Sequence, residues 1–212
     1  MKINEIFMSI QGEGLLTGLP TVFVRLQGCN LRCTYCDTKY SYHKGIDQNI
    51  DQIVNEIGKY RVKRVCITGG EPLLQADTND LVQTLIKKHY NISIETNGSI
   101  SLKKITNNHS LLFSLDIKCP SSGSQNMMDL SNLNIVKKKD QVKFIIGNQA
   151  DLDFACELIR KKKLCAKTNI FFHPVGGIDA KNLVKKILKR GVDVRIGLQI
   201  HKIIWGRNTR GV

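Results

Sequence analysis

The stretch "TVFVRLQGCNLRCTYCDT", residues 21–38, joins an apolar run to three closely spaced cysteines, Cys29, Cys33 and Cys36. The run is rich in valine and ends at a glycine, which predicts a buried strand followed by a loop. Apolar runs of the same kind recur as "RVKRVCIT", "NISIE", "LLFSLDI", "QVKFIIG", "TNIFFHP" and "VDVRIGLQ". Amphipathic stretches between them predict helices near 49–60, 76–89, 150–163 and 179–190, with Asp47, Asp77 and Asp179 at or near their first turns.

Strands that alternate with helices indicate a parallel sheet, and active sites of such sheets lie at the carboxyl ends of the strands. The unusual loops all follow strands: the cysteine loop, then "GGEP", "TNGS" and "KCPSSG". A complete eightfold barrel takes about 250 residues, whereas this chain has 212. We therefore expect an α/β fold, an incomplete (β/α)6-type barrel of parallel strands, formed as a single domain by residues 1–212.

The seven cysteines favour thiolate ligands over disulfides, because the number is odd and three are crowded together. Cys66 and Cys156 stand among apolar residues and are expected in the core, while Cys119 and Cys165 are isolated. No apolar run is long enough to cross a membrane, and Glu5 interrupts the N-terminal stretch where a signal peptide would be apolar. We expect a cytoplasmic protein.

The formal net charge of +14 could attract nucleic acid or an acidic small molecule. The basic residues, however, are spread over helical stretches such as "LIRKKK" and "LVKKILKR". No aromatic residues are interleaved with them as a base-stacking surface requires. Solvated helix faces are the favoured interpretation, and direct nucleic-acid binding is not expected.

Three thiolates leave a metal site one ligand short. A structural zinc site closes with four protein ligands, and His43 is the nearest candidate for a fourth. A [4Fe–4S] cluster also takes four thiolates as a rule, so three would leave one iron open to another ligand. The residues alone allow both sites.

The cysteine spacing, with Tyr35 before the last cysteine, resembles the signature of the radical S-adenosylmethionine (SAM) superfamily, and "TGGEP" at 68–72 resembles its Gly-Gly-Glu stretch. This resemblance implies a [4Fe–4S] cluster on Cys29, Cys33 and Cys36, with SAM on the open iron. It implies SAM contacts from Tyr35, Cys36, Asp37, Gly70, Glu71, Asp116, Ile117 and Lys118. Residues 116–118, "DIK", depart from the Ser-Pro-Lys of many members.

The segments "SIQGEG", "FVRLQGCN", "CDT", "ETNG", "DIKCPSSG" and "LQIHKIIWGRNTRGV" resemble, in this order, the 7-carboxy-7-deazaguanine synthase family from residue 10 to residue 211. The resemblance implies a carbon–nitrogen lyase that converts 6-carboxy-5,6,7,8-tetrahydropterin to 7-carboxy-7-deazaguanine with loss of ammonia. The product would feed 7-deazapurine synthesis toward queuosine or archaeosine in tRNA. Magnesium, an electron donor such as flavodoxin or ferredoxin, and a homodimer are also implied.

The same resemblance assigns substrate contacts to Ile10, Gln11, Gly12, Glu13, Arg25, Thr68, Gln199 and His201, and magnesium to Thr38. An amide and a carboxylate at positions 11 and 13 suit a guanine-like edge. Arg25 stands inside an apolar strand, so it needs a partner, either a substrate carboxylate or an internal salt bridge.

Three further positions are left with two interpretations, and two of the assigned ones have a predicted geometry. Glu95 is expected either to hold substrate or to cap a strand, and Ser121 and Ser122 either to contact SAM or to shape a turn. Gln199 and His201 are expected on one side of an extended run. They belong to a C-terminal segment, about 197–212, that would reach the pterin.

Two other functions share some of these features. A glycyl-radical-enzyme activase has the same cysteine loop and "GGEP" stretch but does not need "QGEG", Arg25 or "QIHK". A zinc-stabilised RNA-binding module would use the positive charge. It would not need the many alternating strands and helices, and its fourth zinc ligand is missing.

Overall fold

A computed structural model describes residues 1–177 and 179–211 of the chain. Its described residues form one nine-stranded sheet in the order β3-β1-β2-β4-β5-β6-β7-β8-β9. Neighbouring strands from β2 to β9 in this order are parallel, and β1 runs antiparallel to both β2 and β3. The strands are β1 Lys2–Ile10, β2 Pro20–Leu26, β3 Ile46–Asp47, β4 Arg64–Gly69, β5 Asn91–Thr96, β6 Leu111–Ile117, β7 Gln141–Ile146, β8 Asn169–Pro174 and β9 Arg195–Ile196.

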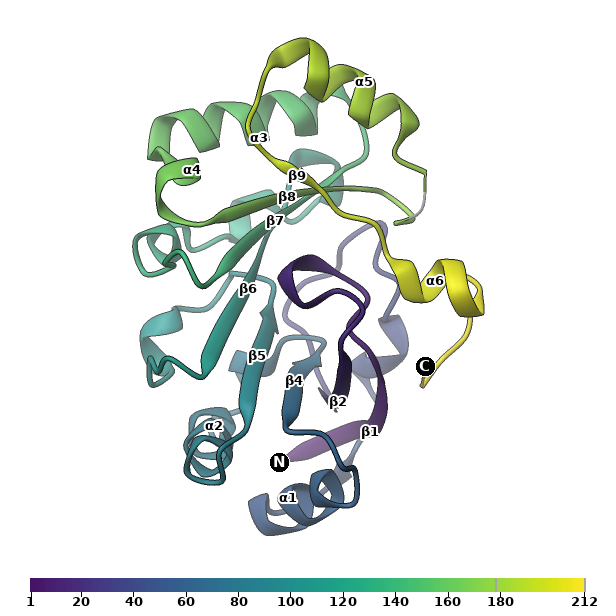
Figure 1. Ribbon diagram of the computed structural model, residues 1–212, viewed down its shortest axis with the longest axis vertical. Coiled ribbons are helices and arrows are strands. Elements are labelled where there is room, and N and C mark those ends of the chain that lie inside the picture. Colours follow the sequence, from purple (N-terminus) through teal and green to yellow (C-terminus); the bar gives the residue numbers. More distant parts are fainter. Residues whose placement is uncertain (178, 212) are drawn as a thin grey trace.

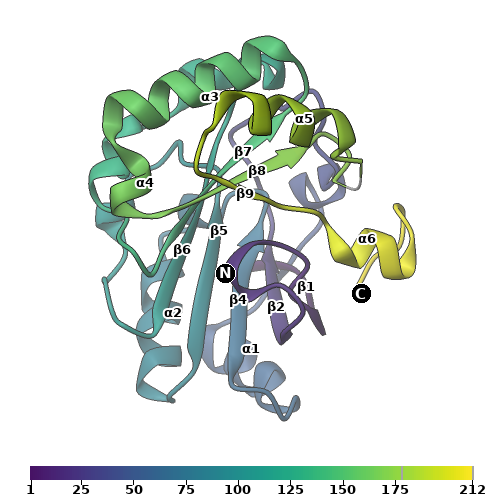
Figure 2. The ribbon, with the colours of Figure 1, turned by 45° about the horizontal axis from the view of Figure 1, so that its top comes forward.

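The helices lie along the outer face of the curved sheet, as the two ribbon views show (Figure 1, Figure 2). They are α1 Ile50–Gly58, α2 Thr78–Lys87, α3 Gln149–Lys162, α4 Leu164–Lys167, α5 Lys181–Arg190 and α6 Ile200–Trp205. None of the helices in the described ranges combines the length and the apolar character that crossing a bilayer demands. The last, α6, differs from the others because it lies beside the hairpin of β1 and β2 (Figure 1).

Helix starts follow local side-chain chemistry. Asn49 caps α1 and Asn148 caps α3, each in a capping box that satisfies free backbone N–H groups of the first turn. Asp47, which we expected near the start of α1, belongs to β3 instead. Asp77 occupies the N-cap position of α2 without a side-chain hydrogen bond, whereas Asp179 accepts one from the N–H of Lys181 (3.1 Å) before α5.

The main core lies between the sheet and the outer helices. Period two along each strand sends one set of side chains to the helices and the other to the inside of the barrel. In β7, for example, Val142, Phe144 and Ile146 are buried toward the core. Lys143 and Ile145 line the internal cavity.

The α/β class with mainly parallel strands is confirmed, and all seven predicted strand runs contain strands. The structure adds β1 and β3, which sequence reasoning missed, and it reduces the run "VDVRIGLQ" to the two residues of β9. Strand β1 was not predicted because its alternation of apolar and polar residues is irregular: charged and polar residues interrupt "KINEIFMSI". Its side chains are largely half-buried, since only one face packs on the molecule.

Candidate active site

One polar side chain from each of six consecutive parallel strands points into a single cavity of about 710 Å³. Adjacent members are close in register: Arg25 lies opposite Thr68, and Asp116 lies opposite Lys143. The carboxyl ends of parallel strands meet at one rim, so residues far apart in sequence gather there. The six, from β2 through β8, are Arg25, Thr68, Glu95, Asp116, Lys143 and His173.

The cysteine loop closes one side of this cavity, because its backbone packs directly on the "GGEP" loop. The N–H of Glu71 donates to the carbonyl of Gly28 (2.8 Å). A Cβ on Gly70 would lie 2.1 Å from the Gly28 oxygen and 2.7 Å from Cβ of Cys29. Only glycine therefore allows the two loops to touch, and the contact fixes where the first cysteine stands.

The three thiols all line the cavity and are half-buried. The sulfur of Cys29 accepts hydrogen bonds from the N–H of Leu31 (3.4 Å) and from Nδ2 of Asn97 (3.7 Å). Cys33 Sγ lies 3.6 Å from the hydroxyl oxygen of Ser124. Donors aimed at sulfur suit a thiolate that is bound to metal.

Across residues 1–177 and 179–211, no three His, Cys, Asp or Glu side chains converge on one ion. A structural zinc site needs four ligands around a single ion. Each thiolate of a cubane cluster binds a different iron. Three thiols that line one cavity supply three ligands of such a cluster and leave one iron open.

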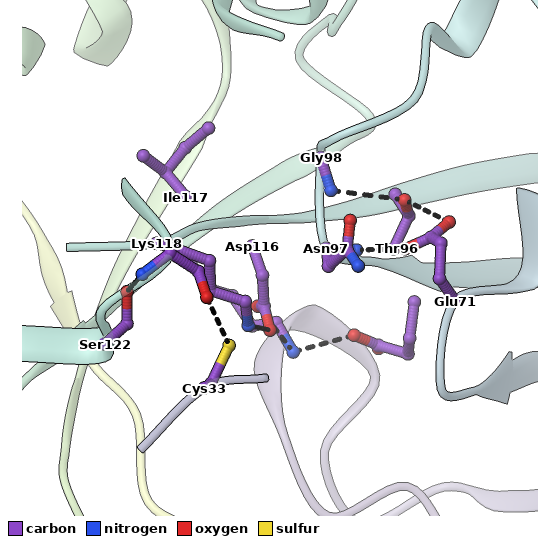
Figure 3. A network of polar contacts seen from close by, with 12 residues as sticks. Cys33, Glu71, Thr96, Asn97, Gly98, Asp116, Ile117, Lys118 and Ser122 are labelled. Carbon is purple, nitrogen blue, oxygen red and sulfur yellow. Dashed lines mark hydrogen bonds and ion pairs between the residues drawn. The ribbon is translucent and has the colours of Figure 1, made fainter. Parts of the chain in front are cut away.

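Glu71 ties this loop to the loop after β5 and is itself fully buried. Its carboxylate accepts from the N–H of Leu73 (3.0 Å), the hydroxyl of Thr96 (2.8 Å) and the N–H of Asn97 (2.6 Å). Figure 3 shows this group beside Asp116, Lys118 and Cys33. The side chains of Glu71 and of Ile117, which is buried in the core, do not line the cavity, because both are used in packing.

A charged cluster occupies the centre of the cavity. Nζ of Lys143 lies 2.7 Å from Glu95 Oε2, 3.0 Å from Glu13 Oε2 and 3.3 Å from Asp116 Oδ1. Asp116 also pairs with Lys118 at 3.0 Å. Glu95 therefore faces the cavity and pairs with a lysine there, and it does not cap the strand.

Burial raises the pKa of Glu13, but Lys143, His173 and a hydrogen bond from Gln199 outweigh burial, so the pKa of this carboxyl falls well below its usual range. For Asp116, burial is outweighed by Lys118 and Lys143, and the pKa is lowered. Glu95 differs: burial and the two neighbouring carboxylates raise its pKa despite Lys143. Glu95 is thus the carboxyl of this cluster that binds a proton most readily.

The C-terminal segment is anchored on the cavity by three contacts. The N–H of Ile200 donates to the carbonyl of Gly12 (3.1 Å), and Gln199 Nε2 donates to Glu13 Oε1 (2.6 Å). Lys202 Nζ donates to Asp37 Oδ2 (2.6 Å), which joins the segment to the cysteine loop. Gln11 also lines this region, and its amide donates to the sulfur of the buried Cys66 (3.7 Å).

The extended run predicted for Gln199 and His201 is wrong, because His201 lies in α6 and Gln199 is its N-cap. The apolar residues Ile200, Ile203 and Ile204 have the spacing of a helix, not the period of two that a strand shows. Both polar residues still line the cavity. Of the predicted segment 197–212, residue 212 lies outside the described residues.

Arg25 has the internal salt bridge that was one of its two predicted partners. Glu5 lies opposite it across β1 and β2, and Arg25 Nε lies 2.6 Å from Glu5 Oε1. The hydroxyl of Tyr40 donates to the same oxygen (3.0 Å). The arginine also lines the cavity, so a ligand there would share it with Glu5.

Thr38 and the serines of "PSSG" differ in where they point. The Thr38 hydroxyl donates to Asp37 Oδ1 (2.9 Å), and both residues line the cavity. Ser121 donates twice to Asp151 of α3, and the Ser122 hydroxyl donates to the carbonyl of Cys119 (2.6 Å). The two serines therefore shape the turn after β6.

Comparison with known proteins agrees with this geometry. Residues 23–128 match the radical SAM superfamily. The chain is 43% identical over 208 residues to a 7-carboxy-7-deazaguanine synthase of Methanospirillum hungatei, covering 96% of this chain and 85% of the relative. It is 40% identical to one of Clostridium acetobutylicum, covering 100% and 99%. The chain belongs to the 7-carboxy-7-deazaguanine synthase family.

A solved structure of QueE from Escherichia coli superposes with a TM-score of 0.74 and 26% identity, over 93% of each chain. The predicted resemblance is thereby confirmed, and family membership decides against the activase and the RNA-binding module. Membership of the radical SAM superfamily implies a [4Fe–4S] cluster and SAM. The cysteine loop and the cavity beside it fit both.

Sequence reasoning missed three basic residues of this candidate site. Lys143 and His173 stand inside apolar strand runs, and the rule that flagged Arg25, that a buried polar group needs a partner, applies to both. Both ring nitrogens of His173 are buried and have no hydrogen-bond partner in the described part of the chain. Arg210 stacks on Tyr40, 4.2 Å from the ring centre, and no sequence signal points to it.

Proposed function

We propose that this chain converts 6-carboxy-5,6,7,8-tetrahydropterin to 7-carboxy-7-deazaguanine and ammonia. The observation that carries the proposal is one continuous cavity, with the three thiols at one wall and the acceptor carboxylates Glu13 and Glu95 inside it. When bound, the cluster and SAM supply the hydrogen-atom abstraction that is characteristic of the superfamily. The chain's own residues bind the reactants and orient them.

Cys29, Cys33 and Cys36 would hold the cluster. SAM would lie between the cysteine loop and the carboxyl ends of β4 and β6. There Gly70 lets the two loops touch, and the Asp116–Lys118 pair offers both an acceptor and a donor. Tyr35 and Asp37 line the same wall. Glu71 and Ile117 would contribute through their backbone only, since their side chains are buried elsewhere.

The substrate would lie over the "QGEG" loop and the inner ends of β4 and β5. An aminopyrimidinone edge presents N–H donors, and Glu13 and Glu95 present ionisable oxygens to receive them. Around this edge lie Ile10, Gln11, Gly12, Thr68, Gln199 and His201. The substrate carboxylate matches the cationic wall, where Arg25 and Arg210 flank Tyr40.

Magnesium would bind at Thr38, with the remaining ligands supplied by substrate oxygens and water. Magnesium keeps several waters and is held by few protein groups, so a single hydroxyl is enough for a shared site. The neighbouring Asp37 carboxylate is already paired with Lys202. Thr38 would therefore be the direct protein ligand, and Asp37 would orient its hydroxyl.

The wider setting follows from the family assignment. We propose that residues 1–212 act as one radical SAM domain, that the protein is a cytoplasmic homodimer, and that flavodoxin or ferredoxin reduces the cluster. Support for a single domain comes from the one sheet of the described residues, whose strands β2 and β4 to β8 all contribute side chains to the one cavity. The product would enter 7-deazapurine synthesis toward queuosine or archaeosine.

The test is anaerobic reconstitution with iron and sulfide, followed by incubation with SAM, a reductant, magnesium and 6-carboxy-5,6,7,8-tetrahydropterin. Mass analysis should find 7-carboxy-7-deazaguanine, which is lighter than the substrate by one ammonia. A preparation that cleaves SAM but leaves the pterin unchanged would refute the proposal. Omission of magnesium in a parallel sample measures the contribution of that ion.

A further inference from the structure

Lys143 has an unusual position for a lysine. Its side chain is 6% exposed, and it stands inside the apolar strand β7, where its neighbours Val142 and Phe144 pack into the core. A buried ammonium is costly unless opposite charges surround it. Within the described residues, Lys143 has three carboxylate partners at 2.7 to 3.3 Å.

These partners come from different parts of the chain. Glu13 lies in the loop after β1, Glu95 in β5 and Asp116 in β6. Glu13 and Glu95 belong to the end of the cavity where the substrate would lie, and Asp116 to the end where SAM would lie. One ammonium thus touches the two halves of the proposed active site.

The cluster has more acceptors than donors. Three carboxylates face Lys143. Among the described residues, Lys118 is the one other lysine that pairs with any of them, and its partner is Asp116. Asp116 Oδ1 is buried and accepts no hydrogen bond from any described residue, although Lys143 lies at ion-pair distance. The oxygens left over are available to N–H and O–H donors of ligands.

We propose that Lys143 is a positioning residue, whose single ammonium joins the carboxylates at the substrate end of the cavity to the carboxylate at the cosubstrate end. This inference rests on the proposed function. Lys143 does not touch the reacting atoms. It holds the acceptors charged and at fixed separation, so that substrate and SAM are bound in register with one another.

Loss of the ammonium should protonate one carboxyl of the cluster. Three buried carboxylates that share one ammonium cannot all remain ionised once that counter-ion is removed. Glu95 is the group that takes the proton, because Glu13 keeps a hydrogen bond from Gln199 and Asp116 keeps Lys118. Other ionisable groups around these carboxylates include Cys66 of β4, His173 of β8, Asp37 of the cysteine loop and His201 of α6.

The first test needs neither the iron–sulfur cluster nor the substrate. Infrared spectra at pH 7, taken as the difference between each variant and wild type, report protonated carboxyl groups directly. Lys143→Met should gain a protonated-carboxyl band that wild type lacks, and adding Glu95→Gln should remove it. Lys143→Arg, which keeps the charge, and Lys137→Met, which removes an exposed lysine from the loop before β7, should both match wild type.

The second test measures coupling in the reconstituted enzyme. Lys143→Met should still cleave SAM without pterin, but kcat/KM for the pterin should fall on the order of 100-fold, the scale for truncating one partner of a buried charge pair. The ratio of 5′-deoxyadenosine to product should rise. The acid limb of the pH profile should also move to higher pH, and Lys143→Arg should restore part of the loss.

The two proposals fail in different ways. If wild type makes no 7-carboxy-7-deazaguanine, the proposed function fails, while the infrared test still decides what Lys143 does. If wild type turns over but Lys143→Met shows no new band and an unchanged pH profile, the positioning role is refuted. Should Lys143→Met not fold, Lys143→Gln, which removes the positive charge and keeps a hydrogen-bond donor, takes its place in both tests.

Discussion

Replacing Gly70 by alanine should displace the cysteine loop, because a Cβ at this position has no room. The added carbon would lie 2.1 Å from the carbonyl oxygen of Gly28 and 2.7 Å from Cβ of Cys29. The φ angle of Gly70 is not in the left-handed region, so alanine adds volume without backbone strain. The variant therefore tests the contact between the two loops alone.

The magnitude follows from the size of the overlap. Atoms in contact need about 3.5 Å, so the Gly28 carbonyl must retreat by more than roughly 1 Å. Overpacking of this kind costs about 1–3 kcal/mol. For a chain of this length, about 2–4 °C of Tm corresponds to each kcal/mol, which gives a fall of roughly 2–12 °C. Since Cys29 moves with the loop, cluster incorporation should fall as well.

Two measurements and one matched control decide this. Thermal unfolding of the cluster-free protein gives the stability change, and visible absorption after anaerobic reconstitution gives the cluster content. Gly58→Ala is the control, because Gly58 ends α1 and a Cβ there meets no atom within 4 Å. If Gly70→Ala unfolds and reconstitutes as Gly58→Ala does, the packing argument is wrong.

Three further outcomes are expected. Thr38→Ala should weaken the magnesium dependence of turnover and leave the visible spectrum of the cluster unchanged; a wild-type magnesium response contradicts the assignment. Cys29→Ala should abolish that spectrum, as should the other two loop cysteines, whereas Cys66→Ala should retain it. Burial raises the pKa of Glu71 in the fold despite its hydrogen bonds from Asn97, Leu73 and Thr96. Above about pH 4.5, the pKa of a glutamate in an unfolded chain, the unfolding free energy of wild type should therefore fall relative to that of Glu71→Gln. Urea titrations at several pH values measure this difference, and a rise with pH would refute the argument.

Apolar runs predicted the parallel part of the sheet well, because a strand buried on both faces must be apolar almost throughout. The run "LLFSLDI", for example, corresponds to the whole of β6, Leu111–Ile117. Strand β1 was missed because an antiparallel strand that packs on one face only tolerates Lys2, Asn4 and Glu5. The segment at 199–205 was misassigned because two polar residues at a spacing of two outweighed the helical spacing of three isoleucines.

The site was predicted in outline by order along the chain, since every loop at a carboxyl end of a parallel strand reaches the same rim. What the sequence could not give is which side chains pair across it. Arg25 could have paired with an internal carboxylate or with a ligand, and the register between β1 and β2 supplies Glu5 while the arginine still lines the cavity. Glu71 is acidic and stands in the signature stretch, yet backbone N–H groups at 2.6 and 3.0 Å hold it in the interior.

The two halves of the cavity are held by different physical means, and this difference bears on how the enzyme tolerates change. The wall formed by the cysteine loop depends on backbone contacts that only small residues permit, as at Gly70. It also depends on the uncharged N–H and O–H donors that surround the Glu71 carboxylate. Close packing of this kind is rigid. The substrate half depends on charge balance around Lys143, which a single proton can upset. Changes in acidity should therefore affect pterin turnover strongly, because the carboxylates proposed to receive the substrate titrate as a coupled group.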